Sequence, residues 1–194
     1  QPPRLDPVAQ TFTVHNREGI FVPAIDIFFR TKSATKGVTL EIRDTVNGYP
    51  ANKVLAEKYL TPAEISVSTE TSGSVTFNAT TFTFRNMCYL KPGKTYCIVL
   101  KPEANNPDYN VWVSELGEFQ VGTNNRVLLA DTAEGVFFTS SNNGTWNAFQ
   151  AEDMMFNMYR AAFNSNLTGV AQLENTGADW LSLKDFTAGV PDTG

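Results

Sequence analysis

The sequence predicts an all-β fold, namely an antiparallel two-sheet β-sandwich of the jelly-roll or immunoglobulin/fibronectin type, followed by a C-terminal extension. Short runs of alternating apolar and polar residues recur along the chain, and turn-forming residues separate them. No segment carries an apolar stripe with helical periodicity. The 14 phenylalanines supply bulky side chains for a core between two sheets.

The clearest strands lie in the first half of the chain. Residues 11–14 and 38–43 alternate between polar and apolar side chains, which predicts strands with one face buried and one face in water. Residues 20–30 form a long apolar run, in which Pro23 indicates a strand start, an edge or a bulge. Residues 47–50 (Asn-Gly-Tyr-Pro) predict a turn, and a short strand is expected after it at 53–59.

Thr61-Pro62-Ala63-Glu64 predicts a single helical turn, with Thr61 as its cap, Pro62 at its first position and Glu64 reaching back. Further strands are expected around 75–77, 82–84, 96–100 and 111–113, and less regular ones at 126–130, 136–139, 145–149 and 153–163. Residues 153–160 are the segment most open to a helical interpretation. A strand is favoured there because Met154, Phe156 and Met158 fall on one side of an extended chain.

Composition changes after residue 163, which divides the chain into a sandwich domain (1–163) and an extended segment (164–194). The second part is rich in Asn, Thr, Gly, Ala and Ser, with scattered apolar residues. It is too apolar for a free linker and too sparse for a core, so we expect it to pack on a neighbour or to lead into a further domain. The chain begins Gln1-Pro2-Pro3, and we expect it to be a segment of a longer polypeptide.

The chain is poor in residues that perform chemistry near neutral pH. It has one histidine (His15), two cysteines and no glycine-rich phosphate loop, which favours a scaffold or a binder without catalytic residues, metal or cofactor. Its net charge of −5, with no basic run, argues against nucleic-acid binding. No stretch approaches the roughly 20 apolar residues that cross a bilayer, so membrane insertion is not expected.

The most specific local signal is a tyrosine corner, a turn at which the chain passes from one sheet to the other. Leu90, Pro92, Gly93 and Tyr96 match the pattern Leu-x-Pro-Gly-x-x-Tyr, in which the tyrosine hydroxyl bonds back to the upstream backbone. A flat hairpin here would place Cys88 opposite Cys97 and allow a disulfide, whereas a corner would separate them. The corner favours two free thiols, and the disulfide stays as the alternative.

An ordered set of motifs carries a resemblance to a known family. Residues 6–12, 19–22, 25–29, 38–43 and 47–50, followed by the Leu-x-Pro-Gly segment, resemble a β-sandwich module of large tail, baseplate and fibre proteins of contractile-tailed bacteriophages. The module is also similar to carbohydrate-binding-module-like sandwiches of bacterial secreted proteins. The resemblance covers roughly residues 5–163.

The resemblance implies a non-enzymatic structural role in the virion, in the phage tail, with other phage structural subunits as partners. A homotrimer is plausible by analogy with phage fibres and tail appendages. The resemblance also leaves open a glycan-facing surface, which would make the chain an extracellular binding module.

That alternative is a module that binds carbohydrate or a host receptor. Its candidate platform comprises four aromatic residues and two loop residues: Tyr49, Tyr109, Trp112, Trp146, Asn105 and Asp108. Core packing or edge cover is the competing interpretation of Trp112, and a plain loop that of residues 105–110. A glycan hydrolase is a third possibility, which requires two carboxylates facing across a cleft, from the set Glu115, Glu118, Glu152 and Asp153.

Overall fold

The computed structural model describes residues 6–71, 74–104, 106–115 and 135–163. The chain divides into two compact units, 1–161 and 162–194, and the fold described below is that of the first unit. Every ladder between its strands is antiparallel. Among the described residues the helical structure consists of one 3-10 turn, η1 (Pro62–Glu64). The predicted all-β class is therefore confirmed.

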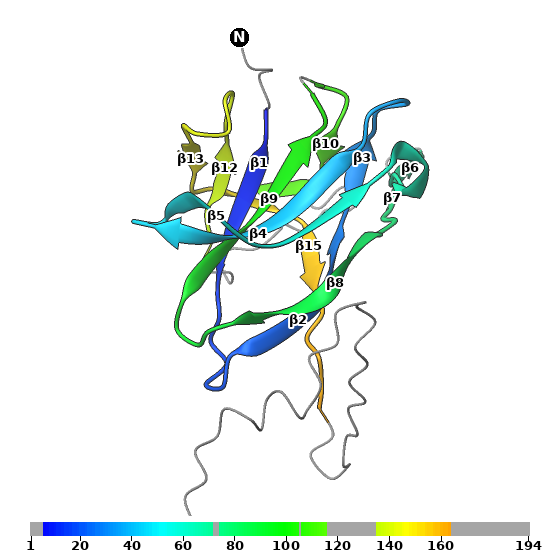
Figure 1. Cartoon of the computed structure of the whole chain (residues 1–194). Helices are drawn as coiled ribbons and strands as arrows, with labels where there is room; N and C mark the ends of the chain where they lie inside the picture. Colours follow the sequence, from blue (N-terminus) through cyan, green and yellow to red (C-terminus); the bar gives the residue numbers. More distant parts are fainter. Residues whose placement is uncertain (1–5, 72–73, 105, 116–134, 164–194) are drawn as a thin grey trace, which may run out of the picture. The chain divides into compact units, whose positions relative to one another are not determined.

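Two sheets form the sandwich (Figure 1). The six-stranded sheet has the order β13-β12-β1-β9-β4-β5, made of β13 (Asn147–Phe149), β12 (Phe137–Thr139), β1 (Val8–Thr13), β9 (Thr95–Pro102), β4 (Val38–Val46) and β5 (Tyr49–Leu60). The three-stranded sheet has the order β15-β2-β8, made of β15 (Phe156–Met158), β2 (Ile20–Ile27) and β8 (Thr80–Leu90). The described residues also form three two-stranded ladders: β3 (Phe29–Thr31) with β10 (Asn110–Val111), β6 (Thr69–Thr71) with β7 (Ser74–Thr76), and β11 (Val113–Glu115) with β14 (Glu152–Met154).

The strands of the two sheets are distributed along the chain as follows. β2 and β8 share the smaller sheet, whereas β4, β5 and β9 are neighbours in the larger sheet. β1 lies between β9 and β12 in the larger sheet.

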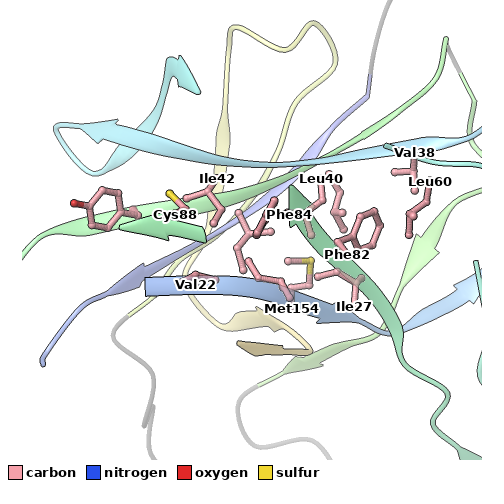
Figure 2. Packing of buried hydrophobic residues seen from close by; sticks show 14 of the residues in the cluster. Val22, Ile27, Val38, Leu40, Ile42, Leu60, Phe82, Phe84, Cys88 and Met154 are labelled. Carbon is pink, nitrogen blue, oxygen red and sulfur yellow. The ribbon is translucent and has the colours of Figure 1, made fainter. Parts of the chain in front are cut away.

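The main core lies between the two sheets and is built from alternate residues of each strand. Figure 2 shows Leu40 and Ile42 of β4 packed with Val22 and Ile27 of β2 and with Phe82 of β8. All five side chains are fully buried. Burying each one stabilises the fold by about 1.5–3 kcal/mol relative to leaving it in water. The alternation of apolar and polar residues along each strand thus determines which face of the sheet packs into this core.

Several local predictions are confirmed. In η1 the Glu64 carboxylate accepts hydrogen bonds from the Thr61 backbone N–H (2.8 Å) and hydroxyl (2.7 Å). The ladder between β2 and β8 breaks between Val22 and Ala24, because Pro23 has no N–H to donate. Residues 152–158 are extended, as β14 and β15. The strand expected at 126–130 lies outside the described residues.

The strand after the first hairpin is longer than predicted. β5 covers Tyr49–Leu60, whereas the sequence indicated a turn through Pro50 and a strand at 53–59. β5 has a ladder partner only in β4 among the described strands, and an edge strand tolerates a proline, so Pro50 does not end it.

The tyrosine corner is confirmed. Tyr96 is buried at the start of β9, and its hydroxyl accepts a hydrogen bond from the Lys91 backbone N–H at 2.9 Å. Gly93 adopts φ 67° in the turn, a conformation that favours glycine. β8 and β9 lie in different sheets, as a corner requires.

The two cysteines are free and buried, so the disulfide alternative is wrong. Cys88 points into the main core, whereas Cys97 points to the opposite face of the six-stranded sheet. Burial raises the pKa of the Cys88 thiol and raises the pKa of the Cys97 thiol to about 12. Burial thus disfavours the thiolate, which is the reactive form of both side chains.

The corner makes a direct prediction about stability. Tyr96→Phe keeps the ring but removes the acceptor of the Lys91 N–H, so the free energy of unfolding should fall by about 1 kcal/mol. Urea denaturation followed by tryptophan fluorescence measures the change. Tyr59→Phe, at a 46% exposed residue, is the matched control and should stay within about 0.5 kcal/mol of the parent chain. Equal stability of the Tyr96→Phe chain would contradict the role of the hydroxyl.

Candidate functional site

The outer face of the six-stranded sheet is covered by a second, smaller core. The outward-pointing Ala9, Cys97 and Val99 pack with Phe138 of β12, and Val136 and Trp146 lie against them. β9 is consequently buried on both faces. Around β9 the sheet therefore lacks the water-facing side that the alternating sequence predicted.

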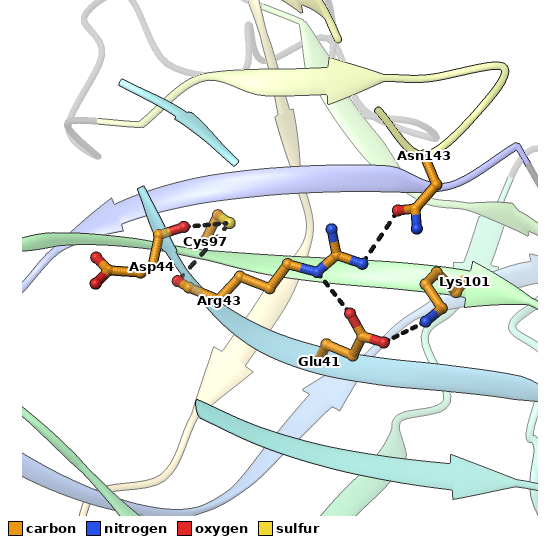
Figure 3. A network of polar contacts seen from close by, with 6 residues as sticks. All are labelled: Glu41, Arg43, Asp44, Cys97, Lys101 and Asn143. Atoms are coloured by element: carbon orange, nitrogen blue, oxygen red, sulfur yellow. Dashed lines mark hydrogen bonds and ion pairs between the residues drawn. The ribbon is translucent and has the colours of Figure 1, made fainter. Parts of the chain in front are cut away.

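A network of charged groups lies on this same outer face, next to the second core (Figure 3). The Arg43 Nε donates to the Glu41 carboxylate at 2.6 Å, and the other oxygen of Glu41 accepts from the Lys101 ammonium. The Arg43 guanidinium also donates to the Asn143 side-chain oxygen at 3.1 Å. Asn143 lies in the connection between β12 and β13, so the network ties that connection to the middle of the sheet.

The burial of Glu41 and Arg43 corrects the expectation of a wet face on 38–43. Their side chains are 2% and 3% exposed, although each alternates with a core residue. Burying a charge is unfavourable unless it is paired and hydrogen-bonded, and here both carboxylate oxygens are engaged. Glu41 is thus saturated and out of reach of a substrate, which makes the network a structural tie and not a reactive site.

The network makes a testable prediction about coupled charges. Glu41→Gln should lower the free energy of unfolding by about 3–5 kcal/mol, because it leaves the buried Arg43 guanidinium without its counter-charge. The double change Glu41→Leu with Arg43→Met should cost less than the sum of Glu41→Leu and Arg43→Met alone, since it removes both charges together. Urea denaturation of the four variants measures this. Additive losses would rule out the coupling.

Two of the four predicted platform rings come together on this face. Tyr49 and Trp146 both contact Phe138, with ring centroids 5.4 Å and 6.5 Å from it. Tyr49 is 49% exposed, and Trp146 is half-buried. Tyr49 and Trp146 are therefore the two predicted platform residues that share a neighbour and are both partly exposed to solvent.

The other two rings are placed elsewhere. Tyr109 packs edge-on against Phe29 of the main core with centroids 5.7 Å apart, and burial raises the pKa of its hydroxyl. Trp112 packs against Phe77 at 5.4 Å, and the Arg30 guanidinium lies 5.5 Å from its ring centre. The structure therefore does not assemble the four rings into one platform, and Trp112 packs as edge cover.

Two neighbouring side chains hold the backbone of the loop at Asp108. The Asp108 N–H donates to the Asn106 side-chain oxygen at 2.9 Å, and the Asp108 carbonyl accepts from the Thr31 hydroxyl at 2.6 Å. Asn105 lies outside the described residues. These contacts fit the plain-loop interpretation.

The carboxylates considered for hydrolysis do not face each other across a cleft. Glu115 and Glu152 are direct cross-strand partners on the β11–β14 ladder, and Asp153 accepts a hydrogen bond from Gln10 at 2.8 Å. Glu118 lies outside the described residues. Within the described part of the chain, no group of three His, Cys, Asp or Glu side chains is placed to hold a metal ion.

A different surface gathers exposed apolar side chains, on the outer side of the three-stranded sheet. We call Phe21, Met87, Tyr89 and Tyr159 the exposed aromatic face; their exposed fractions are 38%, 49%, 44% and 48%. Phe21 and Tyr89 are cross-strand partners with ring centroids 4.9 Å apart. The Tyr159 hydroxyl donates to the buried Asp26 carboxylate at 2.7 Å, which fixes that ring over the sheet.

Sequence reasoning missed this face, although a signal for it exists. Tyr89 stands between Cys88 and Leu90, both buried, so an aromatic residue occupies the solvent side of a strand. Large exposed rings at such positions are the informative exception to burial.

Comparison with protein-family models, with curated proteins and with solved structures finds no match for this chain. In the part of the chain that the structure describes, no helix has the length and apolar character to span a membrane.

Proposed function

We propose that this chain is a non-enzymatic structural domain of a phage tail, baseplate or fibre protein, and that it acts through contacts with other structural subunits of the virion. The exposed aromatic face is the observation that carries this proposal. Phe, Tyr and Met are enriched where protein surfaces bury one another, and single-domain surfaces seldom gather them in one place.

The face is better suited to docking than the sheet edges are. β5 has twelve residues and a free edge among the described strands, but it carries Lys53 and Lys58, and edge lysines discourage strand addition. Residues 84–87 of β8 have no partner on β2, so that ladder is irregular and offers a poor template. The rings of Phe21 and Tyr89 instead lie together on a paired, regular part of the sheet.

The remaining support comes from the sequence. The ordered motifs between residues 5 and 163 resemble a phage tail module, and the net charge of −5 disfavours nucleic acid as the partner. Self-association into a homo-oligomer, such as a trimer, would use the same face in every copy.

The role of the face is tested by a charged substitution on it. Phe21→Lys or Met87→Lys should weaken self-association of the purified chain by about tenfold or more, because a lysine at the centre of an apolar contact is desolvated. Sedimentation velocity over a range of concentrations measures this. Val54→Lys, at a 41% exposed residue of β5, is the matched control and should associate like the parent chain.

The virion role has its own test. Mass spectrometry of purified particles of the phage that encodes this sequence should detect its peptides at structural abundance. Their presence in the infected lysate combined with their absence from particles would refute the proposal, whatever the oligomeric state of the purified chain.

Carbohydrate or host-receptor binding is the second candidate, and the pairing of Tyr49 and Trp146 over Phe138 favours it. Both rings contact Phe138, partly exposed aromatic rings can stack on a sugar, and amide side chains such as Asn142 lie in the connection between β12 and β13. On a glycan array the parent chain should then bind a defined sugar, and Trp146→Ala should lose the signal. Tyr59→Ala, a change of a similarly exposed ring, should retain it. A silent array would contradict this second candidate.

A further inference from the structure

A small pocket opens at the end of the sandwich where β1 begins and β9 ends. Its volume is about 190 Å³, and its deep wall is formed by four buried core residues: Phe29, Val38, Leu100 and Phe137. At about 30 Å³ per water it has room for about six water molecules, and it is smaller than the roughly 300 Å³ of a drug-sized site. It suits one compact apolar group.

Acidic side chains stand at the mouth of this apolar pocket. Asp6 and Glu152 line it, and Asp6 is exposed while Glu152 is half-buried. Neither carboxylate forms an ion pair with any residue that the structure describes. A carboxylate gains little from an apolar wall beside it, whereas a bound cation would stabilise it.

A third carboxylate adds to the negative charge at the same place. Glu115 is the direct cross-strand partner of Glu152, so two like charges stand opposite each other on the β11–β14 ladder. Like charges in this position destabilise a ladder. A cation bound between them would relieve the repulsion.

The lining supplies no positive charge of its own. None of the described residues that line the pocket is a lysine, arginine or histidine. Lys36 contacts one lining residue, because its carbonyl accepts a hydrogen bond from the Tyr109 hydroxyl, and its ammonium lies 3.5 Å from the Glu103 carboxylate. That ammonium is shared with another carboxylate, and the mouth of the pocket stays acidic.

We propose that this pocket binds a compact apolar group that carries a cationic nitrogen at its outer end. The apolar group fills the space against Phe29 and Leu100, and the cation lies at the mouth between Glu152, Glu115 and Asp6. This chemistry has two sources: a free organic amine, or an apolar side chain flanked by lysine in a segment of another polypeptide. The pocket shares no residue with the exposed aromatic face. The proposed ligand site and the proposed assembly role can therefore be tested independently.

Titration of the isotope-labelled whole chain, followed by amide NMR shifts, tests this site. The probes are phenethylammonium for the free amine and the capped tripeptide Lys-Phe-Lys for the polypeptide segment. The matched controls 2-phenylethanol and 3-phenylpropionate have the same ring without the cation. At low salt at least one cationic probe should bind about fivefold more tightly than the alcohol, and the propionate more weakly still. The shifts should centre on Val111, Val113 and Glu152.

Variants separate the two parts of the site. Glu152→Gln should remove most of the preference for the cation over the alcohol, whereas Glu57→Gln, at an exposed glutamate of β5, should leave it intact. Val113→Trp, at the 41% exposed mouth residue, should block all four probes. Glu115→Gln should raise the urea midpoint of the free chain, because it relieves the repulsion without a ligand.

The outcomes are decisive in both directions. Tighter binding of phenethylammonium than of the tripeptide assigns the free amine as the source, and the reverse assigns a polypeptide segment. The proposal would be overturned if neither cationic probe bound more tightly than the alcohol, if the shifts mapped to another surface, or if Glu152→Gln retained the preference. None of these results bears on self-association through Phe21 and Met87.

Discussion

The structure depends on the burial of β9 on both of its faces. This strand is hydrogen-bonded to β1 on one side and to β4 on the other, and residues 97–100 are at most 2% exposed. A strand in this position requires a layer above it and a layer below it. The three-stranded sheet supplies the first layer through the main core, and the side chains of Phe138 in β12 and Trp146 in the connection to β13 supply the second. The remaining features of the domain follow from how these two layers are completed.

The two sheets differ in consequence. On the six-stranded sheet the second layer removes Glu41 and Arg43 from water, and their pairing with Lys101 and Asn143 offsets the cost of that burial. The three-stranded sheet instead carries Phe21, Met87, Tyr89 and Tyr159 on its outer side with roughly two-fifths to one-half of each side chain in solvent. This asymmetry supports our proposal that docking to other protein subunits uses the small sheet.

Local sequence signals predicted local structure well. The capping of Thr61 by Glu64, the break at Pro23 and the corner at Tyr96 each depend on a few neighbouring residues, and each is found as expected. Alternation likewise identified which side of 38–43 closes the main core. It could not show that the other side is also covered, because that depends on a connection about 100 residues later in the chain. The aromatic platform failed for a similar reason: ring type does not reveal whether a residue packs inward, as Tyr109 does on Phe29.

The buried acidic and thiol groups that the fold satisfies differ from the acidic groups beside the proposed pocket. The buried Glu41 and Asp26 carboxylates each accept hydrogen bonds on both oxygens, and the buried thiols have raised pKa values. The hydrogen bonds of these buried groups are made within the domain, so the groups serve the fold and not a ligand. Glu115 and Glu152, by contrast, stand opposite each other beside an apolar pocket. Since a ladder gains nothing from that repulsion, the placement of Glu115 and Glu152 fits the cation that we propose at the pocket mouth.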